Sequence, residues 1–313
     1  MKLLFAGNKE RGLSCLISLR EKHDVVGVIG HKKTSKTNYF VDEVKKMGCK
    51  LFQPSNINDK SFIKKIQELD PDIIVLAGYG SIVKSDFISK AKYGCINLHA
   101  GKLPEYRGSS PMNWALINGD KEFSLSIIQV NKGIDTGNLL IEKEFQITEN
   151  VTIKELTEIA NKNFPKLLLN VLNQIEKKTI KPKAQVREIS SYYPLRFPED
   201  GQIFIDQLTA EELHNRVRAL TSPYPGVSTY YNNKKIRVLK SSLIKRPFFG
   251  ESGRIYRISK EMGIMVCASD KCLWLSEIVD YETGENCIDI FSKYDKLATI
   301  KGVAENYYAN SKI

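Results

Sequence analysis

Short apolar runs alternate with segments of helical periodicity through the first half of the chain. The apolar runs cover residues 2–7, 25–30, 50–54 and 72–78, and the helical segments between them cover residues 13–22, 39–48 and 61–69. Continuous apolar strands separated by amphipathic helices are typical of a parallel sheet that is covered by helices on both faces. The pattern therefore predicts an α/β fold.

The same alternation continues to about residue 180. A further helix leads to a strand at 94–100, and strands at 125–130 and 138–147 are expected to complete the sheet. A long helical pattern at 152–177 closes this part of the chain. Pro165 lies inside that pattern and is predicted to start a segment or to kink the helix.

Beyond this point the pattern changes. Residues 181–202 are rich in Lys, Pro and Ser and follow neither period, as expected of a linker. A helix is predicted at 209–220, a hairpin at 226–242 that turns at Asn232-Asn233, and short strands at 253–259, 263–269 and 272–278. Strands this short and closely spaced predict a small barrel. We therefore expect a catalytic domain at 1–180, a linker at 181–202 and a barrel-like domain at 203–313.

The composition is that of a folded chain with two cores. Of the 313 residues, 42% are hydrophobic. The formal net charge of +11 suggests an anionic partner, either a phosphate-bearing metabolite or a nucleic acid. The lysines are scattered over the predicted helices instead of forming one block, which is equally consistent with solvated helix faces.

Signals for targeting, membrane insertion and metal binding are not found. The apolar run at 2–7 is shorter than the roughly 7 to 15 residues of a signal-peptide core, and no run approaches the about 18 apolar residues of a membrane span. The six cysteines contain no C-x-x-C pair, so neither a zinc site nor a disulfide is predicted. These features predict a cytoplasmic protein.

The turn after the first strand does not carry a dinucleotide fingerprint. Its sequence, GNKERG, lacks the G-x-G-x-x-G spacing, and the second strand ends at Gly30-His31 without an acidic residue for a ribose. A G-x-x-x-x-G-K-[ST] P-loop is absent as well. The turn is consistent with a phosphate or carboxylate site formed by Asn8, Lys9 and Arg11, and equally with a plain tight turn.

Of the four histidines, His99 has the most informative surroundings. His23 and His31 flank the second strand and His214 lies on a charged helix, so each is expected to be a surface or capping residue. His99 follows Asn97 by two positions at a strand end, so both side chains would share one face at the edge where open α/β sheets keep their chemistry. Alone, His99 is equally consistent with a buried histidine that satisfies a carbonyl.

Asp135 stands between two glycines at a turn that joins two predicted strands. By spacing alone it is best explained as an Asx-turn residue. Together with Asn97 and His99, however, it supplies the three roles needed to pass an acyl group to an amine. The imidazole can take the proton lost by the amine, the carboxylate can orient that imidazole, and the amide N–H can bind the oxyanion.

The sequence around these residues resembles a known family. The runs NLHAGKLPEYRGSSPMNWALINGD (97–120) and KGIDTGNLL (132–140) are similar to the signature of the folate-dependent formyltransferases, which use 10-formyltetrahydrofolate. The similarity extends to residues 1–7, 69–83 and 213–241. The resemblance implies a Rossmann-like formyltransferase domain followed by a smaller OB-like β-barrel domain.

The resemblance also implies roles for single residues. Asn97, His99 and Asp135 correspond to the catalytic asparagine, histidine and aspartate of the family. The donor, 10-formyltetrahydrofolate, would leave as tetrahydrofolate, without a metal or a covalent enzyme intermediate. Its pterin ring would lie between the segment at 79–83 and the loop before Asp135. The residues expected at the pterin site are Tyr79, Ser81, Ile82, Val83, Gly133 and Ile134.

One position departs from the family pattern. The family usually has Ser-Leu-Leu-Pro after the histidine, whereas this chain has Gly101-Lys102-Leu103-Pro104. Lys102 would place a cation close to the cofactor or the acceptor.

The acceptor amine is expected to belong to a transfer RNA or to a nucleotide-linked amino sugar. Members that modify tRNA resemble one another in a long basic, glycine-rich insertion after the second strand, whereas residues 30–48 of this chain pass quickly into a helix. The missing insertion argues against tRNA, although Lys32, Lys33 and Lys36 leave room for a phosphate contact.

Two segments favour the sugar. RFPEDGQI (196–203) and the YRG..P.NW arrangement at 106–114 are similar to the domain that formylates UDP-4-amino-arabinose. An arginine at Arg196 or Arg107 could pair with a diphosphate, or Arg196 could be a solvated linker charge. Asn113 and Tyr106 offer polar groups to a hexose. The predicted substrate contacts are Asn8, Lys9, Arg11, Lys102, Tyr106, Arg107, Asn113 and Arg196.

The sequence therefore predicts an N-formyltransferase acting on a UDP- or dTDP-linked amino-deoxy sugar in surface glycan synthesis. The sequence itself is silent on assembly; the resemblance implies a homodimer, because sugar formyltransferases of this type are commonly dimers. One alternative is a methionyl-tRNA formyltransferase. Another, from a different class, is a non-catalytic nucleic-acid-binding protein that uses the C-terminal domain, and it leaves the three polar residues without a purpose.

Overall fold

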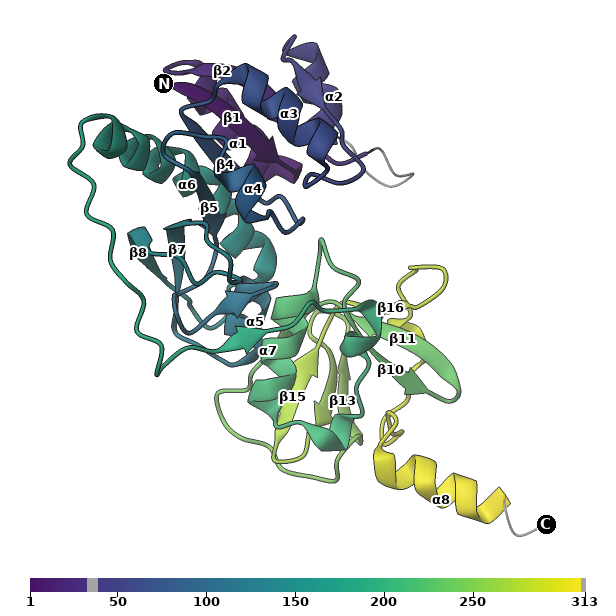
Figure 1. The fold of residues 1–313 in the computed structure, drawn as a ribbon. Coiled ribbons are helices and arrows are strands. Elements are labelled where there is room, and N and C mark those ends of the chain that lie inside the picture. The colour runs from purple at the N-terminus through teal and green to yellow at the C-terminus, as the bar shows by residue number, and fades with distance from the viewer. Residues whose placement is uncertain (33–38, 311–313) are drawn as a thin grey trace. The chain divides into compact units, whose positions relative to one another are not determined.

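The computed structural model describes residues 1–32 and 39–310 (Figure 1). The chain divides into two compact units. The N-terminal unit comprises Met1–Pro111, Phe123–Phe145 and Thr157–Pro194, and the C-terminal unit comprises Met112–Glu122, Gln146–Leu156 and Leu195–Ile313. Two short segments from the first half of the sequence thus belong to the C-terminal unit.

The N-terminal unit is built on a seven-stranded sheet with the order β3-β2-β1-β4-β5-β7-β8. Its strands are β1 (Lys2–Gly7), β2 (Asp24–Ile29), β3 (Leu51–Phe52), β4 (Ile73–Ala77), β5 (Cys95–His99), β7 (Glu122–Gln129) and β8 (Leu139–Gln146). The first five are parallel to their neighbours, whereas β5 and β7 are antiparallel. The sheet is therefore mixed, and the predicted α/β class is confirmed.

Helices pack on both faces of this sheet. They are α1 (Lys9–Arg20), α2 (Tyr39–Lys46), α3 (Lys60–Leu69), α4 (Ser85–Ile88) and α6 (Ile153–Glu176). Leu4 of β1 lies in a buried cluster with residues of α3 and α4. Its neighbour Phe5 points to the opposite face, as alternation along a strand requires, and packs against Phe40 of α2. Helix α6 runs through Pro165 without a break, so this proline does not start a new segment.

The C-terminal unit contains short antiparallel strands. β10 (Val227–Tyr231), β11 (Lys234–Val238) and β16 (Ile278–Asp280) form one sheet, and β12 (Ser241–Ser242), β15 (Cys272–Leu275), β14 (Gly263–Cys267) and β13 (Ile255–Ser259) form another. The predicted hairpin is confirmed: Asn232 and Asn233, with φ of 44° and 62°, form the two-residue turn between β10 and β11. The remaining elements are α5 (Pro111–Ile117), α7 (Ala210–Leu220) and α8 (Ile300–Asn310), with 3₁₀ helices at Pro198–Gly201, Ile205–Gln207 and Ile288–Ile290.

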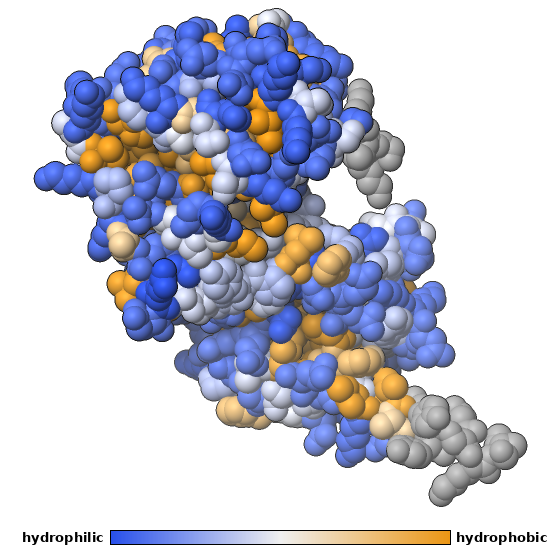
Figure 2. Space-filling view, viewed as in Figure 1, coloured by the Kyte–Doolittle hydropathy of each residue, from blue (hydrophilic) through white to orange (hydrophobic). Residues whose placement is uncertain are grey.

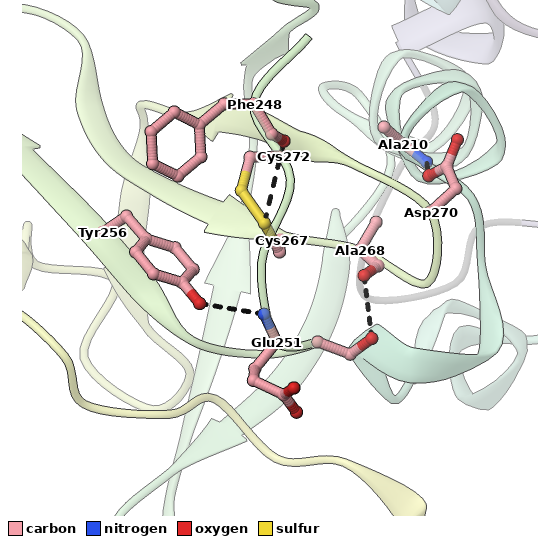
Figure 3. Close-up of a disulfide and its surroundings, with 9 residues drawn as sticks. Ala210, Phe248, Glu251, Tyr256, Cys267, Ala268, Asp270 and Cys272 are labelled. Atoms are coloured by element: carbon pink, nitrogen blue, oxygen red, sulfur yellow. Dashed lines mark hydrogen bonds between the residues drawn. A yellow bond between two sulfur atoms is a disulfide. The ribbon is translucent and has the colours of Figure 1, made fainter.

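The prediction that the cysteines form no disulfide is wrong. Cys267 and Cys272 are disulfide-bonded across the hairpin of β14 and β15, and Phe248 and Tyr256 pack against the cluster that contains them (Figure 3). The two cysteines are five positions apart but stand directly opposite each other in the antiparallel register. A search for C-x-x-C spacing does not detect a pair that a hairpin brings together.

His214, expected to be a surface or capping residue, is instead buried. Its side chain is 3% exposed, with Nδ1 at 2.9 Å from Ser241 Oγ and Nε2 at 3.0 Å from the Glu149 carbonyl. Burial lowers the pKa of this imidazole. One turn later Arg218 is buried too, and it donates to the Val151 carbonyl. The face of α7 that looked solvated in sequence is therefore packed.

Other charged helix faces are exposed, as the scattered lysines indicated. Lys45 and Lys46 on α2 and Lys64 and Lys65 on α3 all face solvent. The side of the molecule shown in Figure 2 is largely hydrophilic, with apolar residues in separate patches. Among the residues that the structure describes, no helix combines the length and apolar character needed to cross a bilayer.

Candidate active site

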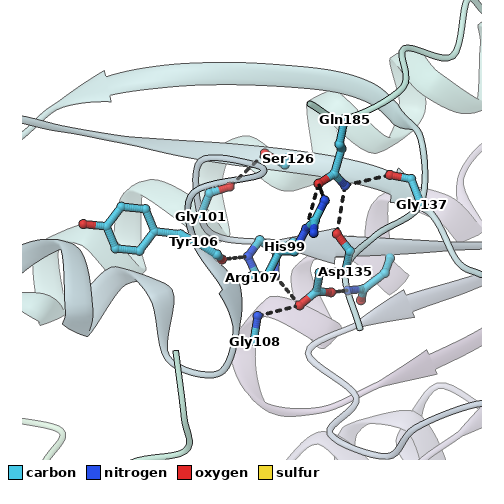
Figure 4. A network of polar contacts seen from close by, with 10 residues as sticks. His99, Gly101, Tyr106, Arg107, Gly108, Ser126, Asp135, Gly137 and Gln185 are labelled. Atoms are coloured by element: carbon cyan, nitrogen blue, oxygen red, sulfur yellow. Dashed lines mark hydrogen bonds and ion pairs between the residues drawn. The ribbon is translucent and has the colours of Figure 1, made fainter. Parts of the chain in front are cut away.

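The N-terminal unit brings together the three residues predicted to be catalytic. Asn97 and His99 lie on β5, and Asp135 lies in the loop between β7 and β8, which reaches back over β5. Asn97 Nδ2 donates to Asp135 Oδ1 at 3.4 Å, and His99 Nδ1 lies 3.5 Å from Asp135 Oδ2 (Figure 4). The side chains of His99 and Asp135 are 6% and 12% exposed. The cluster is therefore compact and mostly shielded from water.

The surroundings of His99 assign its two nitrogens. Nε2 lies 2.6 Å from the carbonyl oxygen of Tyr106. Because a carbonyl oxygen can only accept, Nε2 must carry a hydrogen in this arrangement. Nδ1, which faces the Asp135 carboxylate, is then the nitrogen free to gain or lose a proton. The aspartate is placed to stabilise the charge that protonation creates.

Asp135 adopts a constrained backbone conformation. Its φ of 52° lies in the left-handed region, which disfavours residues with a side chain. The Gly108 N–H donates to Asp135 Oδ2 at 2.9 Å. Gly108 itself has a φ of 97°, and a Cβ there would lie 2.3 Å from the Tyr193 carbonyl oxygen. Only glycine therefore allows the strand β6 (Arg107–Gly108) to pair closely with β9 (Tyr192–Tyr193) while its N–H serves the carboxylate.

A cavity of about 280 Å³ lies beside the loop that carries Asp135. Both ends of that loop form its wall, together with the C-terminal residue of α4 and the first residue of β5. The lining mixes the apolar side chains of Ile88, Cys95 and Val130 with the amides of Asn131 and Asn138. Burial raises the pKa of the Cys95 thiol, so this cysteine remains a neutral part of the wall.

The residues predicted for the pterin site lie in two groups. Tyr79 and Val83 are buried, and the Tyr79 ring stacks on His31 at 4.3 Å between centroids. Ile82 and Ile134 are 69% and 51% exposed. Ser81 and Gly133 are exposed as well. None of these six side chains is among the described residues that line the cavity.

Five of the predicted substrate contacts lie in the N-terminal unit and are exposed or partly exposed. Asn8 is the N-cap of α1, and its side chain accepts from the Lys9 N–H. Lys9 is exposed, and the guanidinium of Arg11 lies 5.2 Å from the Phe164 ring centroid. Lys102 pairs with Glu144 at 3.9 Å. The ring of Tyr106 stacks on that of Tyr193 at 4.8 Å.

Two other predicted contacts are buried and hydrogen-bonded to other residues of the protein. Asn113 is 2% exposed and donates to the Ala219 carbonyl at 2.7 Å. Arg107 is 5% exposed, and its guanidinium donates twice to Gln185 Oε1, at 3.0 and 2.8 Å. Their polar groups are therefore occupied, and neither is presented to a diphosphate or a hexose.

Arg196 lies in the C-terminal unit. Its guanidinium lies 4.9 Å from the Trp114 ring centroid and donates to the Asp200 carbonyl. Burial lowers the pKa of this group. Of the lysines after β2, Lys32 donates to Ser55 Oγ, whereas Lys33 and Lys36 lie outside the described residues.

The sequence pattern did not point to Gln185, although it contacts the same cluster. Gln185 Nε2 donates to the carbonyls of Asp135 and Gly137, at 2.8 and 2.7 Å. Its neighbours on either side are exposed and follow no period, so nothing in the pattern distinguishes it. Only the pairing of distant segments brings it to the site.

The comparisons with solved structures agree on the fold. The crystal structure of an N-formyltransferase from Helicobacter canadensis with folinic acid and dTDP-3-aminofucose matches with a TM-score of 0.70 at 20% identity, covering 88% of this chain and 99% of that one. A methionyl-tRNA formyltransferase from Clostridium thermocellum matches with a TM-score of 0.57, also at 20% identity, over 78% and 94%. At these identities the likeness concerns the fold alone.

The sequence comparisons identify the family. A methionyl-tRNA formyltransferase of Clostridioides difficile (strain 630) is 31% identical over 89% of this chain and 92% of that protein. The bifunctional polymyxin resistance protein ArnA of Wigglesworthia glossinidia brevipalpis is 38% identical over 74% of this chain and 36% of that longer protein. The family model described as formyl transferase matches residues 4–172, and that of the formyl transferase C-terminal domain matches residues 197–284. The chain therefore belongs to the formyltransferase family.

Proposed function

We propose that this formyltransferase moves the formyl group of 10-formyltetrahydrofolate to the amine of a UDP- or dTDP-linked amino-deoxy sugar in surface glycan synthesis. One observation supports the reaction type: the Asn97 amide, the His99 imidazole and the Asp135 carboxylate lie together in one shielded cluster. Such a set holds an oxyanion donor, a proton carrier and a charge that supports it.

The pterin ring of the donor is proposed to lie where the resemblance implies, between residues 79–83 and the loop before Asp135. In those segments Tyr79 and Val83 are buried, whereas Ile82 and Ile134 are exposed. The cavity of about 280 Å³ lies at the two ends of the same loop, and Asp135 is not among the described residues that line it. The Helicobacter canadensis enzyme and another neighbour, WlaRD, were solved with formylated folates, folinic acid and 5-N-formyl-THF.

The residues can move one proton in a closed cycle. 10-Formyltetrahydrofolate supplies a formyl group on a nitrogen that can leave. Asn97 donates to the formyl oxygen as it gains negative charge. His99 takes at Nδ1 the proton that the attacking amine loses and returns it to the departing nitrogen. Asp135 stabilises the imidazolium between these steps. The proton taken from the amine is the one given to the leaving nitrogen, so no further reactant is needed.

The distribution of charge supports a small acceptor. Residues 195–313 contain 17 Lys and Arg against 15 Asp and Glu, so most of the net charge of +11 lies in residues 1–194. A domain that grips a polynucleotide usually carries a strong basic surface. The nearly balanced C-terminal region lacks that excess. Solved neighbours include the enzyme bound to dTDP-3-aminofucose and a sugar 3-N-formyltransferase with dTDP.

A second candidate acceptor is methionyl-tRNA. It is favoured by the sequence relatives, because several methionyl-tRNA formyltransferases are 30 to 31% identical over almost the whole chain. The excess of basic residues in the first part of the sequence would also suit this acceptor.

One assay separates the candidates. The protein is incubated with 10-formyltetrahydrofolate and either a panel of UDP- and dTDP-linked amino sugars or charged initiator tRNA, and release of tetrahydrofolate is followed. Turnover with a nucleotide sugar supports the proposal, and turnover with tRNA alone overturns the sugar assignment. Inertness with every amine would favour a non-catalytic nucleic-acid-binding protein.

A further inference from the structure

One polar network joins the candidate catalytic loop to a segment 50 positions away in the sequence. Gln185 lies at its centre (Figure 4). Both hydrogens of its Nε2 are used, one on the Asp135 carbonyl and one on the Gly137 carbonyl. Its Oε1 accepts two hydrogen bonds from Arg107. The partners fix the orientation of the amide, because carbonyls can only accept and a guanidinium can only donate.

The turn that Gln185 holds would not keep its shape unaided. Asp135 is in the left-handed region, where a residue with a side chain persists only if its surroundings impose it. At Gly137 a Cβ would lie 1.7 Å from the Gln129 carbonyl oxygen, so the turn is pressed against the end of β7. The side-chain amide of Gln185 donates to the carbonyls of Asp135 and Gly137 and so links the two sides of the turn.

Arg107 fixes the side chain of Gln185 and lies next to residues that contact the cluster. The next residue, Gly108, donates to the Asp135 carboxylate, and the preceding carbonyl of Tyr106 contacts His99. Arg107 also donates to the Tyr192 hydroxyl at 3.3 Å. Residues 106–108 therefore face the cluster with their backbone and the segment 185–193 with the Arg107 side chain.

We infer that Gln185 is a positioning residue of this formyltransferase: through its hydrogen bonds to the carbonyls of Asp135 and Gly137 it holds the Asp135 carboxylate against His99, with Arg107 fixing its orientation. This inference rests on the proposed function of the Asn97, His99 and Asp135 cluster. Gln185 lies in the segment that joins the two units in sequence. That segment would therefore contribute to catalysis by positioning Asp135.

The test uses two substitutions at this position and one neighbouring control. Gln185→Ala removes the side-chain amide. Gln185→Glu keeps the size and the acceptor for Arg107 but replaces the donor by an oxygen facing two carbonyls. Val186→Ala changes a side chain that is 52% exposed on the same segment. The full chain is used throughout, and thermal unfolding confirms that each variant is folded.

Two readouts are taken. Hydrogen–deuterium exchange of the 131–138 peptide reports the order of the loop independently of any substrate. Steady-state kinetics with 10-formyltetrahydrofolate and the acceptor found active report kcat and KM. For both Gln185 variants we expect faster exchange in this peptide and a kcat at least about tenfold lower with KM little changed, because displacement of a supporting group costs rate more than binding. Val186→Ala should match the wild type.

The outcomes are distinguishable. Unchanged exchange in Gln185→Ala, or faster exchange with unchanged kcat, overturns the inference. Wild-type behaviour of Gln185→Glu also overturns it, since Gln185 would then serve Arg107 alone. If the wild type transfers formyl to no acceptor, the proposed function fails. The exchange of the 131–138 peptide in Gln185→Ala then still reports on the loop: faster exchange means that Gln185 holds it, and unchanged exchange means that it does not.

Discussion

At the scale of single residues, the two ring nitrogens of His99 face different partners. Nε2 is tied to the Tyr106 carbonyl at 2.6 Å, and Nδ1 faces Asp135 at 3.5 Å. The strand period placed Asn97 and His99 on one face from the sequence alone. The contact with Asp135 could be expected only from the resemblance, because spacing favoured an Asx turn.

Gly101 is a position where restoring the residue usual in the family should harm the protein. A Cβ at Gly101 would lie 2.9 Å from His99 Nε2 and 2.7 Å from Pro111 Cβ. We therefore expect Gly101→Ser to lower kcat by about tenfold or more, because the imidazole must shift. The measurement is tetrahydrofolate release with the acceptor found active.

The control for this change is Lys240→Leu, on the surface of the C-terminal unit. Lys240 pairs with Glu277 at 3.6 Å and both side chains are mostly exposed, so the loss of this surface pair should have little effect on turnover. Wild-type kinetics of Gly101→Ser would show that the loop has room for a side chain and would contradict the account of its packing.

At the scale of elements, the hairpin of β14 and β15 carries the disulfide that the sequence did not reveal. Cys267 and Cys272 are bonded, whereas the other cysteines are free; these are Cys15, Cys49, Cys95 and Cys287. Alkylation of the denatured, unreduced protein should therefore label four thiols by mass spectrometry, and alkylation after reduction should label six. Six labels without reduction would contradict the bond.

The packing of α7 makes stability depend on pH. The pKa of His214 is lowered from its ordinary 6.5 by burial, so below that pH the unfolded chain binds a proton that the folded chain does not. The contribution of neutral His214 to stability is fully present above pH 6.5 and is lost progressively as the pH falls from there toward the lower pKa of the folded state.

We expect the wild type to lose more thermal stability than His214→Gln between about pH 7.5 and about pH 5.5. His23 and His31 also have lowered pKa values, but they are present in both proteins, so their effect cancels. Equal losses in the two proteins would show that His214 takes up its proton without opening the contacts to Ser241 and Glu149.

The sequence predicted the regular elements better than their long-range partners. The periods of apolar residues located the strands and helices of the N-terminal unit, and Asn232-Asn233 located a hairpin. The pattern does not distinguish Gln185, because it lies in a polar stretch without a period. It predicts Arg107 as a possible partner of a diphosphate, although that side chain is buried and bonded to the same stretch. Burial of polar side chains depends on which distant segments meet, and a local pattern does not carry that information.

At the scale of the whole molecule, the placement of charge should show in the salt dependence of the reaction. A diphosphate sugar offers two phosphates, whereas a tRNA stem offers many, each releasing counterions when bound. We expect KM for the nucleotide sugar to rise by about tenfold at most between roughly 50 and roughly 200 mM salt. A rise of a thousandfold or more, at order of magnitude, would point to a polynucleotide acceptor.

The central claim is that Asn97, His99 and Asp135 together carry formyl transfer to a sugar amine. The most direct test compares tetrahydrofolate release by the wild type and Asn97→Ala with 10-formyltetrahydrofolate and nucleotide-linked amino sugars. We predict turnover by the wild type and a rate at least roughly a hundredfold lower in the variant, since loss of one oxyanion donor costs about 3 kcal/mol. Near-normal turnover by Asn97→Ala would contradict it.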